Sequence, residues 1–302
     1  MENMDASLQE KYQFIEFLLL FKGVLTRNEL VIRFSIGEAT ASRLIANYIE
    51  KHPEQMVFMG ARNGYVISES FTLHYSHSVE SALQYLAYGV VSSALPVERY
   101  GHAHLKSFIN LNKMLTAEIT RAIVNNKWLT IKYFSTSSGE TVKNIRPHSL
   151  FKAGNSWYFR AFEVPDMNES FDFPLSHAII QKGYKTFKFS RVLEVNKSDP
   201  LLVGHGISRE RDDDWNRYRH AQLIPHPKAV HPESQMLDLG VKDLGVREII
   251  VSEALLGFTL IDLRVDCSRN ADLNPSEYPL RLNNLKELFN VSSMKIAPGF
   301  SQ

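Results

Sequence analysis

The chain has 302 residues, of which 44% are hydrophobic and 22% charged, and its 34 basic side chains nearly balance its 33 acidic ones. This composition predicts a folded protein of about two to three domains and excludes a polyanion binder that relies on bulk positive charge. The single cysteine, Cys267, excludes an intrachain disulfide framework and a cysteine-rich zinc site, and we expect no cofactor. The longest apolar run near the start is too short for a membrane helix and no signal-peptide pattern follows, so we expect a cytoplasmic protein without a membrane partner.

The N-terminal quarter of the chain predicts three helices and a hairpin. Four apolar side chains at helical spacing predict one buried face on a first helix that ends near Gly23: Phe14, Phe17, Leu18 and Phe21. Residues 26–29 and 35–38 both have the capping-box pattern, which predicts a short second helix and, after a tight turn, a third. The Asn63-Gly64 pair predicts a type I′ turn between two short strands. This order of elements is that of a winged helix-turn-helix.

The third predicted helix, from Gly37 to Lys51, has the residues of a DNA-recognition helix. Its buried stripe is predicted to consist of Ala41, Leu44, Ile45 and Tyr48. Its other face combines small residues, which permit close approach to a major groove, with side chains that hydrogen-bond to base edges. The predicted DNA contacts on this helix and at the wing tip are Thr40, Arg43, Asn47, Lys51, Arg62 and Asn63. The alternative is a protein-docking module, because residues 1–75 carry seven basic and nine acidic side chains.

The middle of the chain divides into two segments. Residues 76–115 predict a helical connector, whereas residues 116–200 predict one short helix followed by strands. Short strands with turn signals between them predict a small, strongly bent β-barrel: residues 128–134, 141–145, 156–162, 173–180 and 186–195. With 12 basic and 8 acidic side chains, this segment is also the most basic part of the chain.

Several segments of the predicted barrel resemble the WYL domain, a family named for a Trp-Tyr-Leu run. Residues 157–159 read Trp-Tyr-Phe, while residues 131–133, 146–150 and 187–192 resemble the family's first strand, its proline-containing segment and its closing strand. Together with the upstream winged helix, the layout is similar to WYL-domain transcriptional regulators, closest to the repressors associated with BREX and CBASS anti-phage defence systems. The resemblance implies an Sm/SH3-like barrel and a C-terminal extension that serves dimerisation.

The resemblance also implies that the barrel binds nucleotides or short single-stranded nucleic acid. Alternation predicts one face for Tyr158 and Arg160 on their strand, and one face for Phe187, Phe189 and Arg191 on the last strand. Guanidinium groups hold phosphates and aromatic rings stack on bases. The predicted ligand site therefore comprises Tyr133, His148, Ser149, Tyr158, Arg160 and Arg191. The alternative for the two arginines is a structural ion pair with Glu163, Asp172 or Glu194.

The C-terminal region, residues 201–302, predicts an α/β arrangement. Residues 248–252 and 259–265 resemble strands, and residues 280–289 resemble a helix. The alternating charges of residues 209–219 are expected on a solvated helix or a subunit contact rather than in a metal site.

Catalytic motifs are not apparent in the sequence. It contains no phosphate-cradling glycine loop, no nucleophile elbow and no HExxH motif, so we expect no catalytic residues, no metal and no enzyme activity. The enzyme alternative is an oligonucleotide-processing hydrolase that uses His148 and Arg191, and Cys267 is a further candidate nucleophile.

The sequence predicts an α+β, multidomain regulator. The expected parts are a winged helix-turn-helix (1–75), a connector (76–115), a WYL barrel (116–200) and a C-terminal dimerisation domain (201–302). We expect a homodimeric repressor of its own or a neighbouring phage-defence operon that binds an inverted-repeat duplex and responds to a nucleotide or single-stranded nucleic-acid effector. The alternative is an RNA or single-strand adaptor without a promoter target.

Overall fold

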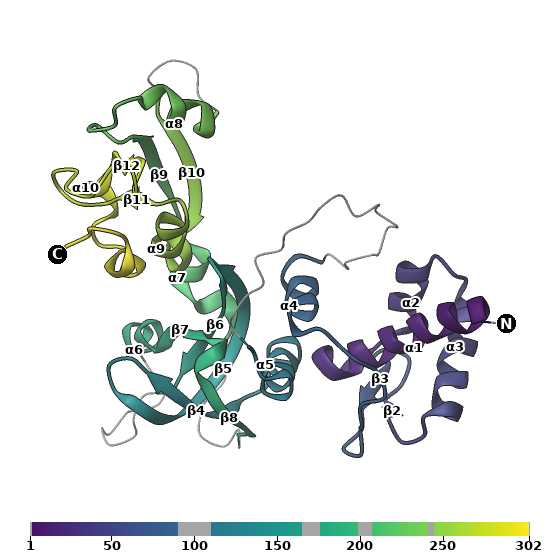
Figure 1. Cartoon of the computed structure of the whole chain (residues 1–302). Coiled ribbons are helices and arrows are strands. Elements are labelled where there is room, and N and C mark those ends of the chain that lie inside the picture. The colour runs from purple at the N-terminus through teal and green to yellow at the C-terminus, as the bar shows by residue number, and fades with distance from the viewer. Residues whose placement is uncertain (1, 90–109, 165–175, 199–206, 241–244, 302) are drawn as a thin grey trace. The chain divides into compact units, whose positions relative to one another are not determined.

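The computed structural model describes residues 2–89, 110–164, 176–198, 207–240 and 245–301 (Figure 1). The chain divides into two compact units. The first comprises Met1–Phe151, Ser156–Asp166 and Lys185–Val203, and the second comprises Lys152–Asn155, Met167–Tyr184 and Gly204–Gln302. The predicted α+β, multidomain class is confirmed. Within the ranges that the structure describes, none of the helices has the length and apolarity needed to cross a bilayer.

The first unit begins with three helices and a small sheet. The helices are α1 (Glu2–Lys22), α2 (Arg27–Phe34) and α3 (Glu38–Lys51), and the strands are β1 (Val24–Leu25), β2 (Met56–Phe58) and β3 (Tyr65–Ile67). The sheet is antiparallel in the order β1-β3-β2, so the hairpin is joined by the strand that follows α1. Buried side chains from all three helices, among them Leu18, Leu30 and Tyr48, form one core. The predicted helix–helix–helix–hairpin order is thus present.

The two predicted capping boxes have different outcomes. The first is confirmed, because the Thr26 backbone N–H and hydroxyl both donate to Glu29 Oε2, at 2.8 and 2.9 Å. The second is wrong. Ser35 ends α2 in the left-handed conformation with φ 50°, and Gly37 is the N-cap of α3 without a side-chain hydrogen bond.

The wing turn also differs from the predicted type I′ turn. The positive φ angles belong to Gly60 (91°) and Gly64 (70°), whereas Asn63 keeps a negative φ. The Met59 N–H donates to the Gly64 carbonyl at 2.9 Å, so the four residues 60–63 turn the chain instead of two. A Cβ at Gly64 would lie 2.4 Å from the Leu25 carbonyl oxygen, which excludes a larger residue there.

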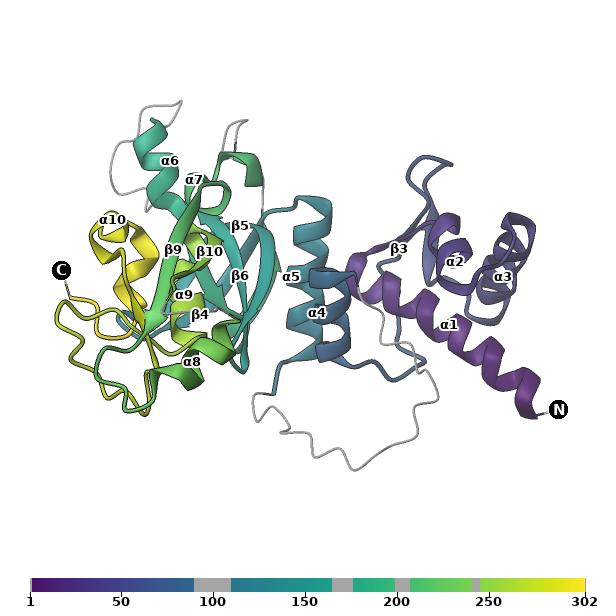
Figure 2. The same ribbon diagram turned by 90° about the horizontal axis from the view of Figure 1, so that it is seen from above.

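Two connector helices, α4 (Val79–Tyr88) and α5 (Lys113–Asn125), belong to two cores at once (Figure 2). Leu83 on α4 and Ile119 on α5 pack into the core of the following sheet. Ala82 and Ala117 pack instead against Leu20 and other buried side chains of α1. As a result α1 is buried on two sides, not on the single face that the apolar spacing predicts. The remainder of the predicted connector, residues 90–109, lies outside the described residues.

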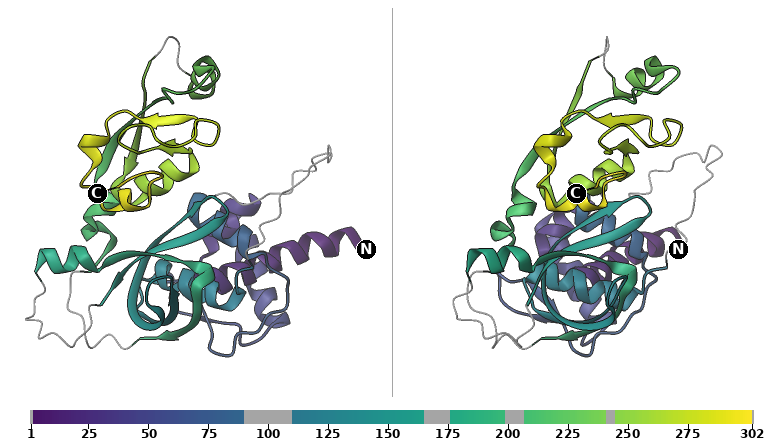
Figure 3. Two further views of the ribbon diagram at one scale, coloured as in Figure 1. Left: turned by 60° about the vertical axis from the view of Figure 1, so that its left-hand side comes forward. Right: turned by 90° about the vertical axis from the view of Figure 1, so that its left-hand side faces the viewer.

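The central sheet has five strands in the order β7-β6-β5-β4-β8. They are β4 (Leu129–Ser135), β5 (Gly139–Ala153), β6 (Ser156–Glu163), β7 (Tyr184–Lys188) and β8 (Val192–Lys197). Only the 3-10 turn η1 (Phe189–Arg191) separates the two edge strands, β7 and β8, so the sheet must curve strongly, as the teal strands in Figure 3 show. Among the described residues no pairing closes it into a barrel. Its core contains Trp157, Phe159 and Phe187.

Three strand predictions in this region are wrong. β5 continues through Pro147 instead of ending there. Of the predicted strand 173–180, residues 173–175 lie outside the described residues and 177–180 belong to helix α6 (His177–Gly183), which the Ser176 hydroxyl caps. The predicted last strand is interrupted by η1, so alternation does not place Arg191 on the face of Phe187.

The second unit contains α6 and a four-stranded sheet in the order β10-β9-β12-β11. The strands are β9 (Tyr218–Pro225), β10 (Arg247–Ser252), β11 (Val265–Asp266) and β12 (Leu280–Leu282), and only β11–β12 is a parallel pair among those described. The other elements are η3 (Arg209–Arg211), α7 (Asp213–Asn216), α8 (Pro232–Leu239), α9 (Glu253–Asp262), α10 (Leu285–Leu288) and η4 (Ser292–Ile296).

Two predictions for this unit are wrong in type. Residues 259–262 are helical, in α9, although β-branched and apolar residues there suggested a strand; short apolar runs do not distinguish the two. Residues 280–289 form β12 and the single-turn helix α10 rather than one helix. The predicted strand 248–252 is confirmed as part of β10.

Candidate nucleic-acid interface

The third helix, α3, has one buried and one exposed face. The four residues predicted to be buried are buried: Ala41, Leu44, Ile45 and Tyr48. All four predicted contact residues on the other face are exposed: Thr40, Arg43, Asn47 and Lys51. Lys51 Nζ lies 5.4 Å from the ring centroid of Tyr12, which holds this cation at the end of the helix. Within the described part of the chain, no hydrogen bond or ion pair engages the side chains of Thr40, Arg43 or Asn47, so their polar groups are available to a partner.

The acidic excess of this segment is partly neutralised inside it. Glu16 is fully buried, Glu29 Oε1 lies 2.7 Å from Lys22 Nζ, and Glu38 Oε2 lies 3.0 Å from Arg27 Nη2. The last of these pairs also joins α2 to the start of α3. A net negative count over residues 1–75 therefore does not imply a negative recognition face.

The wing presents both the predicted residues and some that were not predicted. Arg62 and Asn63 are exposed at its tip, where Asn63 Nδ2 donates to the Met59 carbonyl at 3.4 Å. The apolar side chains of Val57, Phe58 and Met59 are also 54–58% exposed. Sequence reasoning assigned this run to a strand without noting that an edge strand of a small wing leaves such residues uncovered.

Glu16 on α1 anchors the chain that leaves the wing. Its carboxylate accepts hydrogen bonds from the backbone N–H of His74 (2.9 Å) and Tyr75 (2.8 Å) and contacts His77 Nε2 at 2.9 Å. Burial alone would raise the pKa of Glu16, but the hydrogen bonds from His77, Tyr75 and His74 outweigh it and lower the pKa. Sequence reasoning missed this residue, although a lone carboxylate within the apolar residues 14–21 was a signal.

Tyr133, predicted as a wall of the ligand cleft, is instead a core residue. It is 7% exposed and its ring lies edge-on to Phe187 at 5.2 Å. Its hydroxyl accepts a hydrogen bond from the Lys188 N–H at 3.0 Å. Tyr133 thus fixes the end of β7 from inside the sheet.

Tyr158 and Arg160 lie in β6, at positions that alternation assigns to one face. The Tyr158 ring stacks on Phe151 with centroids 5.4 Å apart, and Lys188 Nζ lies 5.8 Å from the Tyr158 ring. Arg160 is buried and its Nη1 donates to Thr186 Oγ1 at 3.4 Å. Phe151 and Lys188 were not predicted as ligand residues. Alternation along β7 places Lys188 on the face opposite the core residue Phe187, so this position was available from the sequence. We call Phe151, Tyr158, Arg160 and Lys188 the aromatic–basic face.

The other predicted ligand residues are placed differently. His148 Nδ1 lies 2.9 Å from the hydroxyl of Ser149, its neighbour on β5, and Ser149 is buried. Arg191 is half-buried in η1. Of the carboxylates considered for the arginines, Glu163 lies 2.6 Å from Lys143 Nζ and 2.8 Å from Lys185 Nζ.

Of the two other carboxylates considered for the arginines, only one lies in the described part of the chain. Glu194 lies 3.5 Å from Lys132 Nζ, and Asp172 is outside the described residues. Burial would raise the pKa of Glu163, but its two lysine partners lower it.

The candidate nucleophile of the enzyme alternative, Cys267, is a core residue. It is 1% exposed, and its thiol donates to the Val265 carbonyl at 3.6 Å. Burial, with a smaller effect from the Asp266 carboxylate, raises the pKa of Cys267 to about 12. A thiol in this state is not a nucleophile at neutral pH. Within the described ranges no group of three or more His, Cys, Asp or Glu side chains is placed to hold a metal ion.

Comparisons with known proteins agree with this arrangement. Residues 7–88 match the family described as "BrxR transcriptional regulator winged helix-turn-helix domain", and residues 114–196 match the WYL domain. The chain is 24% identical over 292 residues to the "DNA-binding transcriptional repressor CapW" of Pseudomonas aeruginosa, covering 93% of this chain and 90% of the relative. A protein of the same name from Escherichia coli (strain KTE188) is 23% identical over 249 residues, covering 76% of this chain and 73% of the relative.

A solved structure also aligns with the chain. "Proteasome accessory factor B/C (PafBC) of Arthrobacter aurescens" is 16% identical, with 96% of this chain and 47% of that chain covered. The chain therefore spans about half the length of that protein. The TM-score is 0.22.

Proposed function

Because the chain belongs to the regulators that join a BrxR-type winged helix-turn-helix domain to a WYL domain, we propose that it represses transcription by binding DNA. The observation that carries this proposal is the exposed face of α3, on which Thr40, Arg43 and Asn47 have no partner among the described residues. Its relatives named CapW are described as DNA-binding transcriptional repressors, which agrees with this conclusion.

In the proposed complex, α3 lies in the major groove. Arg43 is suited to the bidentate contact with guanine and Asn47 to the equivalent contact with adenine, while Thr40 and Lys51 contact the groove and backbone at the two ends. The wing tip, with Arg62 and Asn63, contacts the adjacent backbone or minor groove. Sequence specificity then depends mainly on Arg43 and Asn47, and the wing adds affinity that depends on salt.

The active species is proposed to be a homodimer that binds an inverted repeat in or near a phage-defence operon. Two recognition helices related by a two-fold axis match half-sites about one helical turn, roughly 34 Å, apart. The second unit is suited to dimerisation because β10 is an edge strand and exposes Ile250. In the sheet, Ile250 lies opposite His220 of β9. Ile250 is 62% and Tyr218 is 63% exposed on the same face as the His220–Glu248 pair, so this sheet offers a mixed apolar and polar surface to a second copy.

A nucleotide or a short single-stranded nucleic acid is the proposed effector, and the aromatic–basic face of the curved, Sm/SH3-like sheet is its proposed site. The Phe151–Tyr158 pair offers a stacking surface, and Lys188 and Arg160 supply positive charge for a phosphate. Contacts within the first unit connect this sheet to the DNA-binding helices. The Trp157 indole N–H donates to Glu80 on α4 at 2.8 Å, and α4 and α5 pack against both the sheet core and α1.

The test of the proposed function is binding to duplex fragments that tile the DNA upstream of the gene. The wild-type chain is expected to shift one inverted-repeat fragment in the presence of excess competitor. Arg43→Ala is expected to lose discrimination between that fragment and the competitor, and the double variant Arg160→Ala, Lys188→Ala is expected to bind it as the wild type does. Loss of operator binding in the double variant would make the sheet a DNA-contact or structural module. Binding only to single strands would favour the adaptor alternative.

A further inference from the structure

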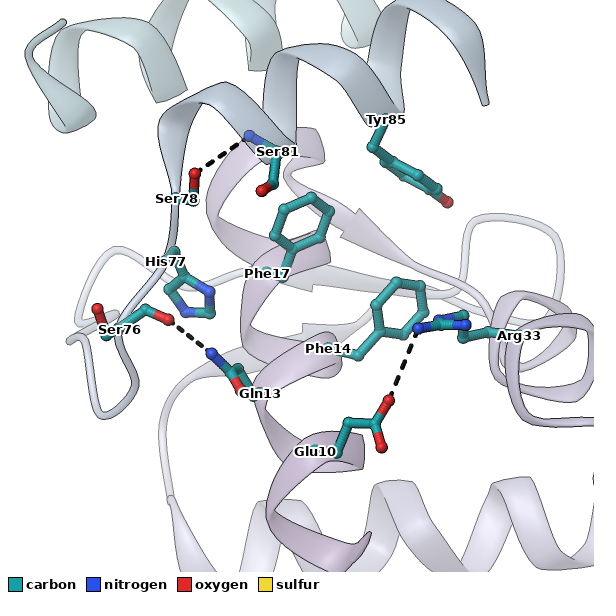
Figure 4. A pocket seen from close by; sticks show the side chains of 10 residues that line it. All are labelled: Glu10, Gln13, Phe14, Phe17, Arg33, Ser76, His77, Ser78, Ser81 and Tyr85. Carbon is teal, nitrogen blue, oxygen red and sulfur yellow. Dashed lines mark hydrogen bonds and ion pairs between the residues drawn. The ribbon is translucent and has the colours of Figure 1, made fainter. Parts of the chain in front are cut away.

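A cavity of about 510 Å³ lies within the first unit, at the base of the winged helix (Figure 4). It is formed by α1, by Arg33 of α2, by α4 and by the segment that leads into α4. The lining residues are Glu10, Gln13, Phe14, Phe17, Arg33, Ser76, His77, Ser78, Ser81 and Tyr85. This volume is in the range of small-molecule sites, and none of these residues belongs to the aromatic–basic face.

One wall of the cavity is aromatic. The Phe14 and Phe17 rings are nearly parallel, with an interplanar angle of 11° and centroids 6.1 Å apart. Tyr85 lies edge-on to both, at 6.3 Å from Phe14 and 5.5 Å from Phe17. Figure 4 shows these three rings between the polar groups of the rim. Such a wall favours a planar ligand, which gains from stacking as well as from apolar burial.

Arg33 presents an unused hydrogen-bond donor. Its guanidinium lies over the rings of Phe14 (5.8 Å) and Phe34 (5.6 Å), and its Nε is buried without a hydrogen-bond partner among the described residues. Its Nη2 lies 3.6 Å from Glu10 Oε1, beyond hydrogen-bond distance. Because Nε is shielded from solvent, a ligand would meet the terminal Nη groups, which make no hydrogen bond among the described residues and would gain an acceptor from it. Glu10 places a carboxylate acceptor beside this donor.

The opposite part of the rim is also polar. Gln13 Nε2 donates to the Ser76 carbonyl at 2.6 Å, which orients the Gln13 side chain at the rim. Ser78 and Ser81 add hydroxyl groups at the start of α4, where the Ser81 N–H donates to the Ser78 hydroxyl at 3.2 Å. Hydrogen-bonding groups therefore lie on more than one side of the aromatic wall (Figure 4).

We propose that this cavity binds a neutral, planar heterocycle with hydrogen-bonding groups around its edge, of the chemical class of a purine base or nucleoside. An edge with a donor next to an acceptor, such as N–H beside C=O, matches Glu10 and Arg33 side by side. An aromatic carboxylate would be repelled by Glu10, and a wholly apolar ligand would cover the Arg33 Nη groups without offering them an acceptor. The opposite charges of Glu10 and Arg33 favour a neutral ligand.

This site is additional to the proposed effector site on the sheet. The cavity lies between α2, which precedes the recognition helix, and α4, which packs on the sheet core. A bound heterocycle would therefore restrain the helix-turn-helix relative to the connector. That consequence rests on the proposed function, whereas ligand binding at the cavity does not.

The test is calorimetric titration of the full chain with guanosine, adenosine and benzoate. At least one nucleoside is expected to bind with one site per chain, and benzoate is not. Arg33→Met keeps the apolar stem over the rings but removes the donors, so it is expected to weaken nucleoside binding about tenfold or more. Arg27→Met, on the same helix but outside the cavity, is the matched control and is expected to bind as the wild type does. Ser81→Leu, which narrows the cavity beside the aromatic wall, is expected to weaken binding strongly.

Three results would overturn the proposal. They are failure of both nucleosides to bind at millimolar concentration, retention of wild-type affinity in both Arg33→Met and Ser81→Leu, and loss of binding in Tyr158→Ala, which would assign the ligand to the sheet. Circular dichroism of each variant verifies that it is folded. None of these results depends on DNA binding, so the site and the proposed repressor function can fail separately.

Discussion

Replacement of Glu16 by alanine should destabilise the winged helix far more than its single charge suggests. The fully buried carboxylate accepts two backbone hydrogen bonds, from His74 and Tyr75, and contacts the His77 ring. Its removal leaves the buried His77 ring and the partly buried N–H groups of His74 and Tyr75 without their acceptor. Loss of one member of a buried, hydrogen-bonded pair costs about 3–5 kcal/mol, which corresponds to about a hundredfold or more in the local opening equilibrium.

Hydrogen exchange of the full chain, followed by mass spectrometry, measures this effect directly. Peptides from α1 and from residues 71–78 should lose about a hundredfold or more in protection in Glu16→Ala, while peptides from the second unit should not change. Glu10→Gln is the matched control, since Glu10 lies on the same helix with a side chain that is 63% exposed. Protection in Glu16→Ala within about fivefold of the wild type would refute the anchoring role.

The same anchor predicts a pH dependence. Because the pKa of Glu16 is lowered in the folded chain, its contribution to stability is fully present above the ordinary carboxyl pKa of about 4.3 and is lost as pH falls through the lowered value. The difference in unfolding free energy between wild type and Glu16→Ala should therefore be constant from neutral pH to about pH 5 and should narrow in more acidic solution. A difference that widened on acidification would contradict the assigned direction.

Four other residues give separate predictions. Arg43→Ala should weaken binding to the operator by about 1–3 kcal/mol per half-site and reduce specificity, whereas Arg62→Ala should weaken binding to all duplexes alike and reduce its salt dependence. Competition titrations at two salt concentrations distinguish the two variants. Identical behaviour of the two would argue against the assignment of α3 as the recognition helix. Gly64→Ala should lower the melting temperature measurably, because of its positive φ and the close Leu25 carbonyl; an unchanged melting curve would refute this. Cys267 should react with a thiol reagent at pH 8 only after unfolding, and fast labelling of the native chain would contradict its burial.

The sequence was sufficient for the features that depend on local periodicity. The buried stripe of α3 and the capping box at residues 26–29 follow from spacing alone, and both are present. Features that depend on contacts across the fold were not accessible. Ser35 has the identity of an N-cap, but the chain uses it to end α2, and the short apolar run of α9 fits a strand equally well.

The candidate sites show the same division. The exposure of Arg43 and Asn47 was predictable because it follows from the opposite, buried face. The partners of Glu16 are 58 to 61 residues away in the chain, so no local pattern indicates them. Alternation along β7 separates Lys188 from Phe187, so its place on the aromatic–basic face was predictable, whereas the cavity around Arg33 requires the packing of α4 against α1.

The most direct test of the central conclusion is the affinity of the purified chain for duplex fragments from upstream of its own gene, at physiological salt and with excess competitor DNA. The repressor function predicts a discrete complex with one inverted-repeat fragment, and Arg43→Ala should lose the preference for that fragment. Weak, salt-sensitive binding of equal strength to every fragment, unaffected by Arg43→Ala, would contradict sequence-specific recognition by α3.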